Sequence, residues 1–402
     1  MQTLETRCCI VGGGPAGVML GHLLARAGVD VVVLEKHEDF RRDFRGDTVH
    51  PSTLDVLHEL GLLEEFLALR HAELREIRAR VGTRDVLLAD FARTGARCQF
   101  MVFMPQSEFL SFLVERSRRY AGFHSMMQAE VTGLVEQAFV TGVRAQTPSG
   151  PLEVRADLVV ACDGRHSTLR GRAGLEVEEV APAIDVLWTR LSKRDGDPQQ
   201  TLGYFDFGRL CITLDRGSHW ECGMVARQGE LASIRERGIG ALRDELARVA
   251  PFASDRTSEI RSWSDVKQLD ARIDRLVRWW RPGLLCIGDA AHAMSPIGGV
   301  GINLAIQDAV AAANVLAEPL KNRTLGNAHL EALQRRRMLP ARLTQEVQAF
   351  IQNRVLARDG LRRAGADRMK PSPTLLMLER FPRLRSIPGR LIGIGLRPEH
   401  VA

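Results

Sequence analysis

A glycine-rich turn near the start of the chain has the residue types and spacing to bind a diphosphate group. It fits the pattern G-x-G-x-x-G and reads Gly12-Gly13-Gly14-Pro15-Ala16-Gly17. In such a turn the first glycine permits the sharp bend, the second lets a diphosphate approach the backbone, and the third lets a helix lie close to a strand. Pro15 suits the first turn of that helix, where its missing N–H costs nothing. The free N–H groups at the start of the helix would point at the diphosphate.

The elements around this turn complete a nucleotide-binding pattern. The apolar run at 8–11 predicts a buried strand, a helix follows the turn until Gly28, and 31–34 predicts a second strand. That strand ends in Glu35, which could accept hydrogen bonds from the ribose hydroxyls of a dinucleotide. We assign Lys36 to the same site. A G-x-G-x-x-G between two strands, with an acid after the second, is a far more specific signal than the glycines alone.

Composition is ordinary for a soluble globular protein of 402 residues, with 45% hydrophobic and 26% charged residues. The sequence shows no uninterrupted apolar run of transmembrane length and no secretory leader, so we expect no membrane span and a cytoplasmic protein. The seven cysteines include no C-x-x-C spacing. We therefore expect buried reduced thiols and no metal site. Six of them lie in apolar, strand-like runs: Cys8, Cys9, Cys162, Cys211, Cys222 and Cys286.

Helix and strand patterns alternate along most of the chain. Antiparallel strand signals between about 180 and 265 predict a second sheet, inserted between parts of the first domain. A basic helical region with Pro340 as a kink follows near the end of the chain. Helices are expected over 52–69, 106–120, 231–249 and 300–316, and strands over 86–88, 100–103, 131–135, 158–162, 187–191, 210–214, 221–226 and 284–287.

Two further motifs, at 157–170 and 288–308, resemble those of the class A flavoprotein aromatic hydroxylases, the p-hydroxybenzoate hydroxylase-like family. All three motifs occur in the family's order and the likeness spans nearly the whole chain. The resemblance implies non-covalent FAD, with NAD(P)H as a transient co-substrate and O2 as the oxidant. It also implies hydroxylation of an electron-rich aromatic or quinone-like small molecule through a flavin C4a-hydroperoxide.

The same resemblance assigns expected roles to single residues. Asp163 would brace the diphosphate region and Asp289 would accept from a ribityl hydroxyl. Arg45 would hold the diphosphate and follow a moving flavin, and Pro296 would border the substrate. The remaining expected cofactor contacts are Gln106 at a helix start, Val131 through its backbone, and Gly299, Gly301, Ile302 and Asn303 at the start of a long helix.

Two departures from the family pattern leave the catalytic acid and base unassigned. Val300 replaces a usual polar residue between the glycines of the second flavin loop, and the chain has only two tyrosines. His50 and Tyr204 are substrate-side candidates, although a packing role fits each as well. Two alternative functions remain. One is another flavin enzyme of the same superfamily, a halogenase or a polyprenyl reductase, although the absence of W-x-W-x-I-P disfavours the halogenase. The other is a flavin-loaded regulatory or binding protein.

The predicted fold is α/β: a discontinuous Rossmann-like FAD-binding domain, an inserted, mostly antiparallel β-sheet substrate domain and a C-terminal helical segment. The expected boundaries are 1–73, 105–178 and 267–335 for the FAD-binding domain, 74–104 and 179–266 for the substrate domain, and 336–402 for the C-terminal segment.

The C-terminal region from Lys321 onward carries 17 Lys and Arg against 6 Asp and Glu. We expect one helical face to pack on the FAD-binding domain while the arginines face outward. The apolar residues expected on that face are Leu339, Leu343, Val347, Phe350 and Ile351. The arginines would either form a solvated helix face or attract an anionic partner. That partner would be a membrane surface, in a weak contact, or an acidic substrate. No nucleic-acid motif is present, and the sequence leaves the oligomeric state open.

Overall fold

The computed structural model describes residues 2–41, 47–198, 202–206, 209–227, 229–356 and 370–402. Its main sheet has the order β17-β18-β11-β1-β2-β8, in which β18, β11, β1, β2 and β8 run parallel. The strands are β1 (Gln2–Val11), β2 (Val31–Leu34), β8 (Phe123–Met126), β11 (Gly150–Ala161), β17 (Trp280–Arg281) and β18 (Leu284–Cys286). The segments 8–11, 31–34 and 158–161 are buried on both faces, as expected for a sheet covered on two sides.

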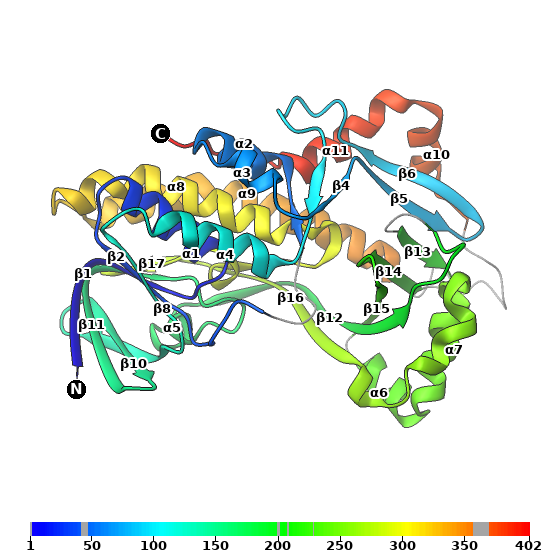
Figure 1. Cartoon of the computed structure of the whole chain (residues 1–402), viewed down its shortest axis with the longest axis horizontal. Helices are drawn as coiled ribbons and strands as arrows, with labels where there is room; N and C mark the ends of the chain where they lie inside the picture. The colour runs from blue at the N-terminus through cyan, green and yellow to red at the C-terminus, as the bar shows by residue number, and fades with distance from the viewer. Residues whose placement is uncertain (1, 42–46, 199–201, 207–208, 228, 357–369) are drawn as a thin grey trace.

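Helices cover one face of this sheet, and a hairpin extends its other side (Figure 1). Helix α1 (Pro15–Arg26) packs against α8 (Gly301–Lys321) and α4 (Gln106–Ser117). The hairpin consists of β9 (Glu130–Glu136) and β10 (Val140–Thr147), and β10 pairs with β11. The short helix α5 (Thr168–Arg172) lies beside β9. This arrangement confirms the Rossmann-like domain.

The second sheet is mostly antiparallel, as predicted, with the order β19-β16-β12-β15-β14-β13-β5-β6. Only the β13–β5 pair is parallel. Helices α6 (Glu230–Glu236) and α7 (Ile239–Val249) pack on one face, at the right of Figure 1. The strands are β5 (Glu76–Val81), β6 (Arg84–Asp90), β12 (Val177–Ser192), β13 (Leu202–Asp206), β14 (Arg209–Asp215), β15 (His219–Arg227), β16 (Lys267–Leu276) and β19 (His292–Ala293).

A small third sheet lies between the two large ones. It pairs β7 (Met101–Phe103) with both β3 (Thr48–Val49) and β4 (Ala72–Leu74). Only β5 and β6 of the predicted segment 74–104 therefore join the substrate-side sheet. The domain boundaries stay a prediction.

Two expected helices are each divided in the structure. The segment 52–69 forms α2 (Pro51–Glu59) and α3 (Leu63–Leu67), separated by Gly61 with a φ of 69°. The segment 231–249 forms α6 and α7, separated by Gly238 with a φ of 85°. A left-handed glycine ends a helix at little cost, and the apolar periodicity on either side hides this break.

The long helix α9 (Asn327–Leu356) continues through Pro340, and our prediction of its packing face was wrong. The side chains of Leu339, Leu343, Val347, Phe350 and Ile351 are exposed, at 36 to 64% of their full surface. Buried glutamines on the other side of the helix, among them Gln345 and Gln348, face the protein instead. The reason is that the surface beneath α9 presents backbone N–H and C=O groups, which amide side chains can pair and aliphatic ones cannot.

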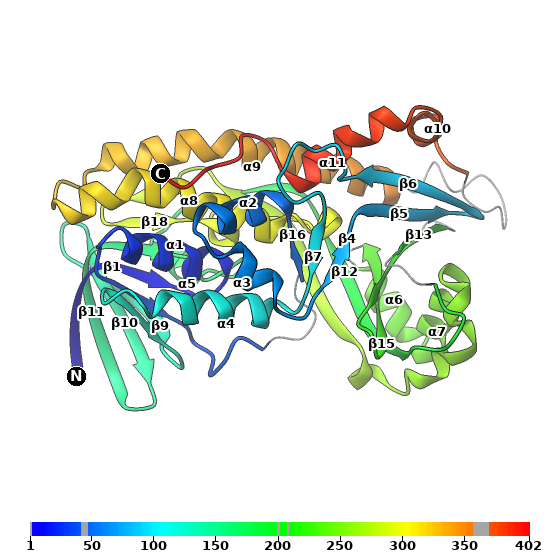
Figure 2. The same cartoon turned by 45° about the horizontal axis from the view of Figure 1, so that its top comes forward.

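The C-terminal segment runs back along the protein to the FAD-binding side, where its end lies near α2 and α8 (Figure 2). It begins with α10 (Pro373–Arg380) and α11 (Ser386–Gly393), which lie over β6. The Val401 N–H then donates to Glu59, and Glu399 pairs with Arg336. The end of the chain is therefore anchored, although several apolar side chains of α10 and α11 remain exposed.

The structure also bears on the expectations for a membrane span and for the cysteines. Among the described residues, one helical stretch, Ile297–Lys321, is long and apolar enough to cross a membrane, and 72% of its apolar window is buried inside the protein, as in a core helix. All seven cysteines are free and buried.

Candidate functional site

The expected cofactor residues follow the carboxyl ends of four neighbouring parallel strands. The glycine turn follows β1, Glu35 follows β2, Asp163 follows β11 and Asp289 follows β18. Because these strands are adjacent in the order β18-β11-β1-β2, the four segments meet at one edge of the sheet. This edge is where open α/β sheets bind their ligands.

The geometry of the glycine turn matches the three expected roles. Gly12 has a φ of 110°, and a Cβ there would lie 2.3 Å from the carbonyl oxygen of Cys162. A Cβ on Gly17 would lie 2.0 Å from the carbonyl oxygen of Gly12. A Cβ on Gly14, in contrast, would meet no described atom within 4 Å. The first and third glycines are thus required by packing, while the second faces open space that a diphosphate can occupy.

Glu35 lies beside this turn. Its Oε2 accepts from the Gly13 N–H at 2.8 Å, and its Oε1 accepts from the His37 N–H at 3.1 Å. The Ala129 N–H donates to the Glu35 carbonyl, which brings Val131, two residues along β9, to the same region. Lys36 is exposed next to the carboxylate.

Asp163 is partly buried, and its two carboxylate oxygens differ in their hydrogen bonding. Its Oδ2 accepts from the Leu169 N–H at 3.2 Å, whereas its buried Oδ1 has no hydrogen-bond partner among the described residues. Burial raises the pKa of this carboxyl above its usual value. A buried acceptor without a donor is costly, so a bound polar ligand at this edge would satisfy it.

Asp289 lies in the turn that follows β18, close in space to the start of α8. Its Oδ2 is 3.4 Å from Nη2 of Arg165, and its Oδ1 is 3.9 Å from the position of a Cβ on Gly301. The backbone N–H groups of Gly301, Ile302 and Asn303 are the first of α8 and have no partner within the helix. Fixed N–H dipoles at a helix start can stabilise negative charge, as on a reduced flavin.

Asn303 uses its side chain for structure. Its Oδ1 accepts from Ser52 Oγ at 2.7 Å and from Thr53 Oγ1 at 2.8 Å, which joins α2 to α8. Only its backbone N–H remains for a cofactor. The preceding Gly299 has a φ of 65°, and its carbonyl accepts from Thr48 Oγ1 at 3.3 Å.

A buried charged network lies next to the Asp289 turn, and sequence reasoning missed it. Asp308 accepts from the Gly288 N–H at 3.0 Å, from His292 Nε2 at 2.6 Å and from Arg337 Nε at 2.8 Å. Desolvation alone would raise the pKa of Asp308, but His292 and Arg337 hold it below its usual value. Glu399 lies on the far side of Arg337, at 3.6 Å.

The substrate-side candidates are dispersed. Both ring nitrogens of buried His50 are engaged, Nδ1 with the Ile392 carbonyl at 2.7 Å and Nε2 with the Gly299 carbonyl at 3.0 Å. Tyr204 is buried on the α7 side of the second sheet, where it stacks on Phe252. Pro296 alone is partly exposed, beside the second flavin loop. We therefore retain only Pro296 as a residue that could border substrate.

Gln106 is linked through Asp47 to the second sheet. The Gln106 N–H at the start of α4 donates to Oδ1 of Asp47 at 3.0 Å. Asp47 also forms an ion pair with Arg216 of the β14–β15 turn, which sequence reasoning missed. Arg45 lies outside the described residues.

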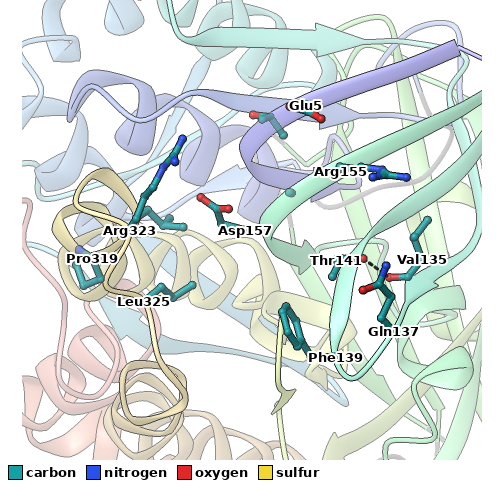
Figure 3. Close-up of a pocket in the computed structure, with 13 residues that line it drawn as sticks. Glu5, Val135, Gln137, Phe139, Thr141, Arg155, Asp157, Pro319, Arg323 and Leu325 are labelled. Atoms are coloured by element: carbon teal, nitrogen blue, oxygen red, sulfur yellow. Dashed lines mark hydrogen bonds between the residues drawn. The ribbon is translucent and has the colours of Figure 1, made fainter.

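One groove in the structure lies away from this site. A groove of about 510 Å³ is lined by Glu5, Asp157, Phe139 and Arg323, among others (Figure 3). Glu5 lies in the amino-terminal half of β1, and Arg323 follows the last residue of α8. The groove is therefore at the end of α8 remote from Gly301.

Comparison with known proteins identifies the family. Residues 5–347 match the model of a family described as FAD binding domain. A 6-methylpretetramide 4-monooxygenase of Streptomyces rimosus is 34% identical over 400 residues, which cover 96% of this chain and 92% of that protein.

Two solved structures share the fold at lower identity. The OxyS anhydrotetracycline hydroxylase of Streptomyces rimosus is 24% identical with a TM-score of 0.75, over 97% of this chain and 76% of that one. The flavin-dependent brominase Bmp2 is 16% identical with a TM-score of 0.76, over 97% of this chain and 93% of that one. Together, the site, the family match and the relative at 34% identity show that the chain belongs to the class A flavoprotein aromatic hydroxylases and is an FAD-dependent monooxygenase.

Proposed function

We propose that the protein hydroxylates a multi-ring phenolic substrate with FAD bound along the carboxyl edge of the main sheet. The observation that carries the assignment of the site is the meeting of the glycine turn, Glu35, Asp163 and Asp289 at that edge. When bound, FAD supplies the redox chemistry with NAD(P)H and O2, and the protein binds, orients and excludes water.

Each residue in this proposal serves a chemical need of FAD. The N–H groups at the start of α1 face the diphosphate, Glu35 accepts from the adenosine ribose and Asp289 from the ribityl chain. The partnerless Oδ1 of Asp163 accepts from a polar group of the cofactor. The N–H groups of Gly301 and Ile302 face the flavin ring. Arg45, Gln106, Val131 and Lys36 remain in the proposal as weaker contacts.

The substrate class is supported by the second sheet. The face opposite α6 and α7 carries an apolar surface of buried and partly buried side chains, in which the ring of Trp188 lies 2.8 Å from the position of a Cβ on Gly223. An extended apolar wall fits a planar, multi-ring molecule better than a single small ring. The residues of this surface are Ile184, Val186, Trp188, Phe205, Leu210, Ile212, Leu214, Val225, Leu269 and Ala271.

The name of the relative, 6-methylpretetramide 4-monooxygenase, supports a substrate of the same class. Purified protein should carry FAD and oxidise NAD(P)H faster when 6-methylpretetramide is added than when phenol is added. Equal stimulation by both would remove the multi-ring proposal and leave the monooxygenase assignment standing. Brominated or chlorinated product in the presence of halide would instead favour the halogenase alternative.

Two further statements belong to the proposal. Free, buried cysteines support a cytoplasmic location. Exposed Met377, Phe381 and Ile387, next to the arginines of α10 and α11, support a weak contact of this segment with an anionic membrane surface. No nucleic-acid partner is proposed.

A further inference from the structure

Gln348 of α9 pairs with the backbone of the loop that joins β19 to α8. Its Oε1 accepts from the Ser295 N–H at 3.1 Å. Its Nε2 donates to the Ser295 carbonyl at 3.0 Å and to the Ile297 carbonyl at 2.8 Å. The side chain is 3% exposed. Both amide hydrogens and the amide oxygen are therefore used, on backbone groups only.

The loop depends on these bonds because it has little regular structure of its own. It leaves the second sheet after the two-residue strand β19 and then forms only a single short turn, Ile297–Gly299, with Gly298 at a φ of 83°. The amide of Gln348 supplies Ser295 and Ile297 with the hydrogen-bond partners that a neighbouring strand would supply in a sheet.

Neighbouring glutamines on α9 bond the strands from which the loop starts. Gln345 Nε2 donates to the Asp274 carbonyl at 2.7 Å and to the Ala293 carbonyl at 3.0 Å. Gln352 Nε2 donates to the Pro182 carbonyl on β12 at 2.8 Å. Two turns of α9 thus tie the loop to the second sheet.

The supported loop is the one that reaches the flavin in the proposed function. Pro296 lies between the two residues that Gln348 holds, and Gly299 and Gly301 follow directly. A shift of Ser295 and Ile297 would move Pro296 and change how the first N–H groups of α8 face the flavin.

We propose that Gln348 is a positioning residue of this monooxygenase, which fixes the loop 295–299 against the flavin ring. The inference rests on the proposed function for the placement of the flavin. It adds a residue outside the three flavin-binding motifs, on a helix that does not itself carry a cofactor contact.

The test compares Gln348→Met with Gln334→Met. Gln334 is a matched control because it also pairs with backbone on α9, accepting from the Trp279 N–H at 3.1 Å and donating to the Val277 carbonyl at 3.0 Å, away from the loop. The readouts are the midpoint potential and visible spectrum of bound FAD, with the melting temperature as a measure of folding.

We expect Gln348→Met to weaken the preference for reduced over oxidised FAD by about tenfold, which is about 30 mV for a two-electron couple. The potential becomes more negative because the N–H dipoles at α8 are less well aimed at the reduced flavin. Gln334→Met should leave potential and spectrum unchanged even if its melting temperature falls equally.

Equal potentials and spectra in the two FAD-loaded variants would overturn the inference. A second variant, Gln348→Glu, keeps the size of the side chain and an oxygen that can accept from the Ser295 N–H. It places a carboxylate against the carbonyl oxygens of Ser295 and Ile297, so it should shift the potential at least as far as Gln348→Met does. If both Gln348 variants fail to fold while Gln334→Met folds, the residue is part of the core and the inference is overturned. Wild-type protein that binds no FAD would contradict the proposed function instead.

Discussion

Nη2 of Arg165 lies 3.4 Å from Oδ2 of Asp289, and this ion pair joins the turns that follow two adjacent strands, β11 and β18. Both side chains are partly exposed at the edge of the sheet. The arginine orients the carboxylate beside the start of α8, so that the carboxylate can accept a hydrogen bond from a cofactor hydroxyl.

Asp289→Ala should therefore weaken FAD binding by about 10- to 100-fold, since a hydrogen bond to a charged group is worth roughly 1.5–3 kcal/mol. Titration of apoprotein with FAD, followed by flavin fluorescence, measures the effect. Asp157→Ala is the control, because Asp157 pairs with Arg7 inside strands β11 and β1 and not in the turns that follow them. Equal FAD affinity of Asp289→Ala and wild type would remove Asp289 from the site.

Arg45→Ala should slow flavin reduction by NAD(P)H more than it weakens FAD binding. An arginine that only neutralises phosphate would affect binding, whereas one that follows a moving flavin would affect the reduction step. Stopped-flow reduction of FAD-saturated enzyme separates the two. A reduction rate equal to that of wild type would contradict the role in flavin movement.

The edge of the sheet was predictable because each motif directly follows an apolar run. Residues 8–11, 31–34 and 158–161 read as buried strands, and parallel strands bring their carboxyl ends together. The glycine turn, Glu35, Asp163 and Asp289 could therefore be grouped from the sequence alone. The antiparallel character of the second sheet followed from the same reasoning.

The supporting contacts were not predictable in the same way. The partners of Asp308 come from two segments, 288–292 and α9, and nothing local in the sequence links Asp308 to Arg337. Apolar periodicity on α9 indicated the wrong face, because the surface under the helix offers backbone groups that Gln348 and its neighbours satisfy. Burial of amide side chains has no periodic signature, so only the folded arrangement reveals it.

Asp308→Asn should destabilise the protein by about 3 kcal/mol at pH 7, because it leaves buried Arg337 with only the more distant Glu399 as a counter-charge. The pKa of Asp308 is held low in the folded protein, so its contribution is present above the unfolded pKa of about 3.9 and is lost as pH falls through the folded value. The difference between variant and wild type should therefore narrow below about pH 4.

Urea unfolding at pH 7, 5 and 3.5 tests this dependence. Asp85→Asn is the control, because Asp85 pairs with Arg80 at the surface and should contribute about 1 kcal/mol or less. A constant difference between Asp308→Asn and wild type at all three pH values would contradict the assignment of an ionised Asp308.

The C-terminal segment should co-sediment with anionic liposomes at low salt and dissociate at high salt. Long-range attraction of its arginines is screened over about 8 Å at physiological ionic strength, so the dependence should be steep. Phe381→Ser combined with Ile387→Ser should reduce binding without affecting FAD content. Sedimentation that does not differ between neutral and anionic liposomes would end the membrane proposal.

Oxygen-isotope incorporation tests most directly the proposal that this FAD-dependent monooxygenase hydroxylates multi-ring phenols. FAD-loaded enzyme would be supplied with NAD(P)H, 6-methylpretetramide and isotopically labelled O2, and the product analysed by mass spectrometry. We expect one labelled oxygen atom per hydroxylated product, and no product in the absence of FAD. A product whose new oxygen comes from water, or one formed without NAD(P)H oxidation, would contradict the proposal.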